Sequence, residues 1–245
     1  MEITRVVETG PAALLFALTF LFGGRVGWLR RIVRDERAVV SFGAGMSAAY
    51  VFVHLMPELH GVRVAFAETA SIVLRYEGMA IYVVALVGFL AFYALDHFRL
   101  RLQDGSREEE VGGAFKLHIG GFGAYAWVMA YLLVNNMEEA TVSMGAYALA
   151  IAFHFLAVTH HLREEHRSAY DHLGRYVLAG AVVLGWGVGF LLPLPRSGVA
   201  LLTAFISGGI IMNSTIMELP SEKDGRFFPF LSGGLLYGLI LLPLG

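Results

Sequence analysis

Cysteine is absent from the 245 residues, and charged side chains make up only 16% of them. Without cysteine the chain forms no disulfides and no thiolate metal sites, and it has no cysteine nucleophile. The formal net charge is −2, so the chain lacks the basic excess with which nucleic-acid-binding proteins hold a polyanion. We therefore expect no nucleic-acid partner.

Hydrophobic residues, by contrast, make up 57% of the chain. Average soluble domains are about 45–50% apolar and about 25% charged, so the composition excludes a disordered chain and an ordinary soluble enzyme. A membrane-spanning helix needs about 20 mostly apolar residues. We predict an all-α, multi-pass membrane protein in contact with lipids, with one transmembrane domain (1–245) and eight transmembrane helices. The predicted spans are 11–24, 39–59, 79–98, 118–141, 145–161, 175–193, 198–218 and 227–244.

Two boundaries of these spans are open in the sequence. The first span is short, and it can borrow residues that precede Pro11. The fourth and fifth spans are separated only by a tight turn that we place near Ser143, Met144 and Gly145.

The basic residues predict the orientation. Of the 18 Lys and Arg residues, 14 fall in the four loops that follow odd-numbered spans: 25–37, 99–116, 163–175 and 219–226. The positive-inside rule then makes these loops cytoplasmic and puts both termini outside. The longest of them is the predicted inner loop 99–117. We expect the protein in the cell (inner) membrane of a prokaryote.

Spans two and seven resemble each other. Span two contains small residues from Gly43 and ends on Pro57 and Glu58, and span seven contains small residues from Ser207 and ends on Glu218 and Pro220. Because the two spans run in opposite directions, their similarity indicates an inverted repeat, as in many secondary transporters. The similar segments are short, so the alternative is that they resemble each other by chance.

Ionisable residues at membrane depth are functional candidates by default. In span four, Asn135 and Glu139 are four residues apart and share a helix face, while Asn136 points about 100° away. In span five, His154 is near the middle, at a depth that we expect to match that of Asn135. Carboxylate, amide and imidazole groups together suit a divalent cation. Alternatively, the acids mark the water-exposed end of span four, and His154 is a hydrogen-bonded packing residue.

Two further sets flank this predicted centre. His54 and Glu58 lie near the outer end of span two, where an entering cation would meet them first. At the inner end, His161 and Glu165 share one helix face, and Glu218 closes span seven; these form a predicted exit, or else an ordinary charged helix end. Asp96, His97 and His118 also lie at inner ends, and we interpret them as bordering the inner loop rather than binding metal.

This arrangement resembles the ZIP family of divalent metal transporters. The resemblance lies in His54-Leu-Met-Pro57-Glu58, in Glu218-Leu-Pro220, and in Asn135-Asn136-Met-Glu138-Glu139, where Asn135 stands in place of the usual His. It implies a 3+2+3 inverted repeat, a homodimer, and a metal site at the centre of the membrane between spans four and five. If the ligand positions of the family are carried over to this sequence, one site retains Asn135, Glu139 and His154, and a second site retains only Asn136.

We therefore expect a carrier, not an enzyme, that moves a divalent metal ion toward the cytoplasm, with zinc as the expected substrate and iron or manganese as alternatives. A metal-dependent intramembrane hydrolase remains open, because several His and Asp residues lie near the inner face. So does a haem-carrying electron-transfer protein that uses His pairs as axial ligands, or a membrane protein that only binds or regulates.

Overall fold

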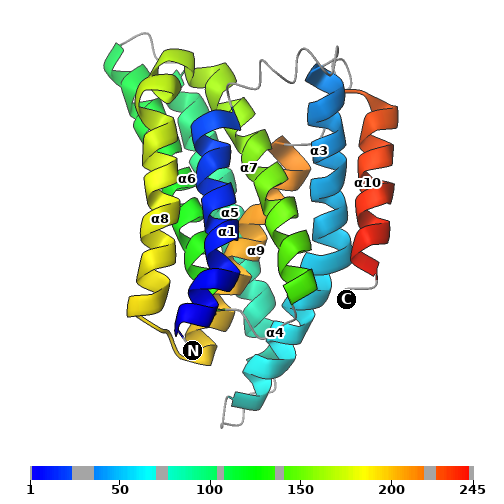
Figure 1. Cartoon of the computed structure of the whole chain (residues 1–245). Coiled ribbons are helices and arrows are strands. Elements are labelled where there is room, and N and C mark those ends of the chain that lie inside the picture. Colours follow the sequence, from blue (N-terminus) through cyan, green and yellow to red (C-terminus); the bar gives the residue numbers. More distant parts are fainter. Residues whose placement is uncertain are drawn as a thin grey trace.

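The computed structural model describes residues 2–23, 36–69, 77–103, 108–135, 141–217 and 225–242, and the regular elements within these ranges are all helices (Figure 1). They are α1 (Glu2–Phe22), α3 (Glu36–Tyr50), η2 (Val51–Leu55), α4 (Met56–Thr69), α5 (Glu77–Gln103), α6 (Glu108–Asn135), α7 (Thr141–Ala169), η3 (Tyr170–Gly174), α8 (Arg175–Leu191), α9 (Arg196–Met212), η4 (Asn213–Met217) and α10 (Phe227–Leu241).

Within the described residues, six helical segments are long and apolar enough to cross a membrane. They are Thr4–Phe22, Arg37–Val64, Gly78–Leu102, Gly112–Asn135, Tyr147–Leu191 and Arg196–Ile216, and α10 is a shorter apolar helix. Many large apolar side chains on their outer faces are half exposed or more, including Leu90 of α5 and Leu184 of α8. Since soluble proteins rarely expose contiguous apolar surface of this kind, the chain is a multi-pass membrane protein.

Helix boundaries correct part of the prediction. α1 begins at Glu2 and contains Pro11, so the first span does borrow residues from before the proline. The turn predicted near Ser143 is wrong: α6 already ends at Asn135, and Ser143 and Gly145 lie inside α7. Small residues near a polar stretch resemble a turn, but a helix packed among apolar neighbours tolerates them.

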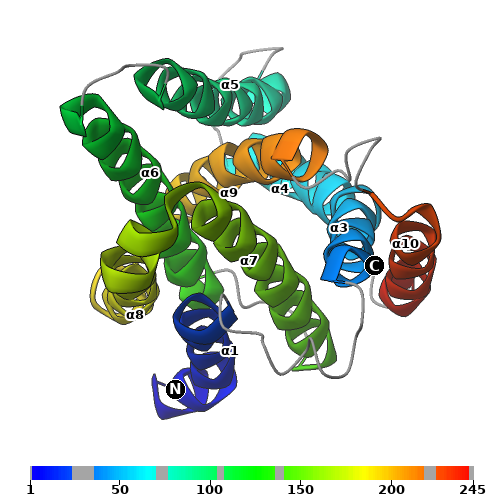
Figure 2. The same ribbon diagram turned by 90° about the horizontal axis from the view of Figure 1, so that it is seen from above.

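The helices of the described ranges pack as two groups of four rods. One group contains α3 with its continuation η2 and α4, α5, α9 and α10; the other contains α1, α6, α7 and α8. Figure 2 shows α10 beside α3 and α9 beside α5, with α8 beside α6 on the other side of the bundle. Between the groups, α5 contacts α6 and α3 contacts α7.

Glycines explain why pairs within a group approach so closely. A Cβ on Gly208 of α9 would overlap the carbonyl oxygen of Ala85 on α5, and one on Gly45 of α3 would overlap that of Phe230 on α10. A Cβ on Gly185 of α8 would likewise overlap the carbonyl oxygen of Trp127 on α6. Small residues let helix backbones touch inside a membrane, where burial from water no longer drives association.

Two glycines of α10, Gly234 and Gly238, face α3 of the same chain. Gly234 faces the backbone of Gly45 at 3.4 Å from an added Cβ, and Gly238 faces Ala49 at 3.9 Å. This face of α10 is therefore covered by α3.

Spans two and seven, whose sequences resemble each other, both depart from regular α-helical geometry. Span two contains a π-helical turn at Val51–Leu55, and span seven contains one at Asn213–Met217. The segments also touch, because the hydroxyls of Ser47 and Ser214 form a buried hydrogen bond of 2.8 Å. Single π-helical turns are frequent at functional sites.

Candidate metal centre

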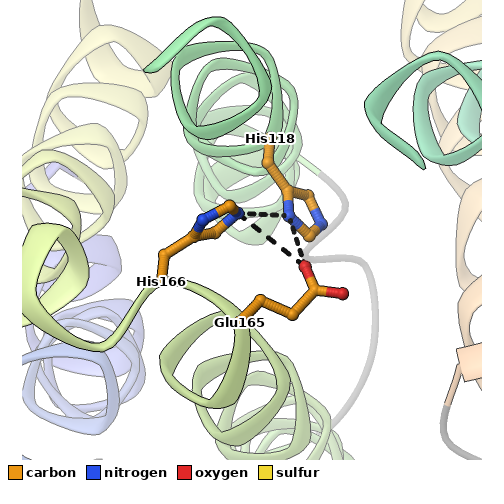
Figure 3. Close-up of side chains that lie close together, drawn as sticks. All are labelled: His118, Glu165 and His166. Carbon is orange, nitrogen blue, oxygen red and sulfur yellow. Dashed lines mark hydrogen bonds and ion pairs between the residues drawn. The ribbon is translucent and has the colours of Figure 1, made fainter. Parts of the chain in front are cut away.

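A break in α7 brings two adjacent side chains to the same place. On a regular helix, Glu165 and His166 would point about 100° apart. His166 has non-helical backbone angles (φ −125°, ψ 34°), which interrupt α7 at this point. Both side chains consequently reach toward His118 on α6 (Figure 3).

We call this group of three residues the triad: His118, Glu165 and His166. Each of them contributes one ligand atom, and these atoms all lie within 4.8 Å of one another. His118 Nδ1 lies 3.3 Å from Glu165 Oε2 and 3.4 Å from His166 Nε2. His166 Nε2 lies 3.8 Å from the same carboxylate oxygen. The side chains of His118 and His166 are only 1% and 5% exposed, so the two imidazoles are shielded from solvent, whereas the side chain of Glu165 is 19% exposed.

These separations suit a tetrahedral metal ion. Two ligand atoms that are each about 2.1 Å from a tetrahedral Zn²⁺ lie about 3.4 Å apart. The three edges of the triad, 3.3, 3.4 and 3.8 Å, are close to that value. Two imidazoles and one carboxylate leave a fourth position for water or another ligand, as in zinc sites that exchange what they bind.

The triad also has polar atoms that the protein itself does not satisfy. Glu165 Oε2 and His118 Nε2 are buried and have no hydrogen-bond partner among the described residues, although Oε2 keeps its ion-pair contacts with His118 Nδ1 and His166 Nε2. Leaving a buried polar atom unsatisfied costs about 1–3 kcal/mol. A ligand that binds Oε2 would remove part of that cost.

The second carboxylate oxygen of Glu165 has other partners. Arg99 Nη1 of α5 donates to Oε1 at 2.6 Å, and His161 Nε2 lies 3.4 Å from the same atom. Arg99 also donates to Asp96 Oδ1 through Nη2 at 2.6 Å and Nε at 3.0 Å. The two oxygens of Glu165 are thus divided, one facing the histidines and one facing the arginine.

The predicted inner pair is confirmed as a contact, since His161 and Glu165 are neighbours on one face of α7. The interpretation of His118 as a residue bordering the inner loop is wrong. α6 begins at Glu108 rather than at 118, so His118 is in the third turn and is buried. His97, by contrast, is exposed, as expected for a loop border.

Asn135 and His154 are not brought together. The amide of Asn135, at the end of α6, donates to the carbonyls of Tyr131 and Gly189 at 3.1 and 3.2 Å. His154 Nε2 is instead 2.9 Å from the hydroxyl of Tyr125. Tyr125 precedes Asn135 by ten residues, which is about 15 Å along a helix, so the expected equal depth is wrong.

Of the other predicted site residues, the structure describes some and not others. His54 Nε2 and Glu58 Oε2 are 3.8 Å apart at the junction of η2 and α4, so these two are neighbours as their spacing predicts. Asn136, Glu139 and Glu218 lie outside the described residues, and their place in a site stays a prediction.

His166 and Arg99 were missed by the sequence reasoning. His166 directly follows Glu165, and a regular helix would have pointed it away from the triad. Arg99 lies in the predicted cytoplasmic loop 99–116, where basic residues are expected to be solvated. One signal was present for His118: it is an ionisable residue inside the apolar segment Gly112–Asn135.

Comparison with known proteins adds no identification: no family model, curated protein or solved structure matches this chain.

Proposed function

We propose that this protein is a membrane carrier that binds a divalent transition-metal ion at the triad and moves it toward the cytoplasm. The observation that carries the proposal is the triad geometry, with three ligand atoms from two helices at separations of 3.3–3.8 Å. Imidazole and carboxylate ligands favour Zn²⁺, with Fe²⁺ or Mn²⁺ as alternatives. The segment from His54 to Glu58, which resembles the ZIP family, is consistent with the same substrate class.

We infer the position of the triad in the membrane from the proposed topology of eight spans with both termini outside. Helices overlap all eight predicted ranges, and α1 begins and α10 ends toward the same end of the bundle (Figure 1). The junction of α7 and α8, next to the triad, lies at the opposite end. The basic loops 99–116 and 163–175 assign that end to the cytoplasm, so we place the triad on the release side.

The division into two helix groups supports a carrier rather than a rigid channel. Glycines let backbones touch within each group, as where Gly208 of α9 lies against α5, whereas the α5–α6 contact at Gly121 involves the side chain of Leu95. Contacts between side chains can rearrange more readily than contacts between backbones. We therefore propose that the two groups move relative to each other, as repeats do in secondary transporters.

Uptake into vesicles tests this function. Protein reconstituted with a zinc-sensitive dye inside the vesicles should admit external Zn²⁺, and Glu165→Gln should reduce the initial rate about tenfold or more, because a buried cation needs the carboxylate charge. The matched control is Glu164→Gln, since Glu164 is 65% exposed and pairs with His160 outside the triad.

Equal rates for wild-type protein and protein-free vesicles would contradict the carrier proposal. Full uptake by Glu165→Gln would show that ions pass without the triad.

A metal-dependent intramembrane hydrolase is the second candidate, because three protein ligands and an open position also describe catalytic zinc sites. Such an enzyme needs an acid or base close to the metal-bound water. The nearby carboxylate of Asp96 is engaged by Arg99 at 2.6 Å, and this pairing favours the carrier.

A further inference from the structure

Arg99 is buried although its neighbours in the chain are exposed. Its side chain is 4% exposed, whereas Phe98 and Leu100 are 56% and 46% exposed. Burying a cation is costly unless carboxylates pair with it and satisfy its donors. Asp96 and Glu165 do so at 2.6 Å each, which fixes the guanidinium between them.

Glu165 is therefore shared between a permanent cation and the proposed metal. Arg99 holds Oε1, and Oε2 is the oxygen that lies 3.3 Å from His118 and 3.8 Å from His166. Figure 3 shows that the second oxygen of Glu165 points away from both histidines. A divalent ion on Oε2 would thus face a fixed positive charge on the far side of the same carboxylate.

The charges around the triad set the size of this opposition, and the Asp96 carboxylate, which also pairs with Arg99, offsets part of it. With neutral histidines, Glu165 supplies the only negative charge in the triad, and Arg99 already neutralises part of it. Like charges separated by a few ångströms in a poorly solvated site repel far more strongly than they do in water. The opposing charge also comes from the other helix group, because Arg99 belongs to α5 whereas the triad belongs to α6 and α7.

We propose that Arg99 is the residue that sets the metal affinity of the triad, keeping binding weak enough for release at the cytoplasmic end. The inference rests on the proposed function, since it assumes that the triad binds a divalent ion. Arg99 contributes through its charge, and its orientation of Glu165 is secondary.

Titration calorimetry with Zn²⁺ on the full-length protein in detergent tests the proposal. Removing the charge in Arg99→Gln should lower the Kd for Zn²⁺ about tenfold or more, because the ion no longer faces a buried cation. Arg99→Lys keeps the positive charge but not the fork of donors that Arg99 presents to the two carboxylates, so the Kd should fall less than in Arg99→Gln. Arg101→Gln, an exposed arginine in the same helix, is the control and should change nothing.

An unchanged or higher Kd in Arg99→Gln would overturn the proposal and leave Arg99 as a residue that only orients Glu165. If Arg99→Gln does not fold, Asp96→Asn tests the same charge: it leaves the positive charge of Arg99 less neutralised, so the Kd for Zn²⁺ should rise. An unchanged or lower Kd in that variant overturns the proposal as well.

Failure of the proposed function gives a different result. In that case wild-type protein binds no Zn²⁺, or His118→Ala binds it as well as wild type does. Loss of binding in His118→Ala without tightening in Arg99→Gln refutes only the role of Arg99.

Discussion

Replacing His118 by alanine is expected to raise the Kd for Zn²⁺ about 100-fold, because it removes one of three protein ligands from a buried site. His166→Ala should have a similar effect. His118→Ala/His166→Ala should cost less than the sum of the two single changes, because ligands that share one ion are coupled. Titration calorimetry in detergent measures all three values.

His160→Ala is the matched control for these histidine variants. His160 is on the same helix, is 43% exposed and pairs with Glu164. It should bind Zn²⁺ as wild type does. Additive losses in the two triad variants, or a loss in His160→Ala as large as theirs, would show that the histidines do not act on one ion.

Gly208→Ala is expected to destabilise the protein by about 3 kcal/mol, which exceeds the usual effect of a surface substitution. Its Cβ would overlap the carbonyl oxygen of Ala85, so α9 and α5 would have to move apart. Thermal unfolding in detergent should show a clearly lower Tm.

Gly120→Ala provides the comparison for this effect. Gly120 is exposed on α6 and has no atom within 4 Å of an added Cβ. Alanine has the higher helix propensity, so the Tm should stay the same or rise slightly. Equal Tm values for Gly208→Ala and Gly120→Ala would contradict the close packing of α5 and α9.

Much of the helical architecture could be predicted from the apolar runs. Such runs are long, and few alternatives exist for a backbone inside a bilayer, where its polar groups must bond internally. The end of α6 could not be predicted in the same way, because Gly145 is compatible with a turn and with a packed helix. That error of several residues also produced the wrong relative depth of Asn135 and His154.

The candidate site was predicted only in part. The four-residue spacing of His161 and Glu165 correctly predicts one helix face. His166 joins Glu165 only because the backbone departs from helical geometry there, and no periodicity reveals such a break in advance. The pairing of Arg99 with Glu165 depends on how α5 packs against its neighbours, which a single sequence does not specify.

X-ray absorption at the zinc edge, on purified protein loaded with one equivalent of Zn²⁺, tests the central claim most directly. The triad predicts two imidazole nitrogens at about 2.0–2.1 Å and one carboxylate oxygen at about 2.0–2.2 Å in a four-coordinate shell. One imidazole should be lost from the spectrum in His118→Ala. A six-coordinate shell of oxygens, or an imidazole signal unchanged in both His118→Ala and His166→Ala, would contradict the assignment of the metal to the triad.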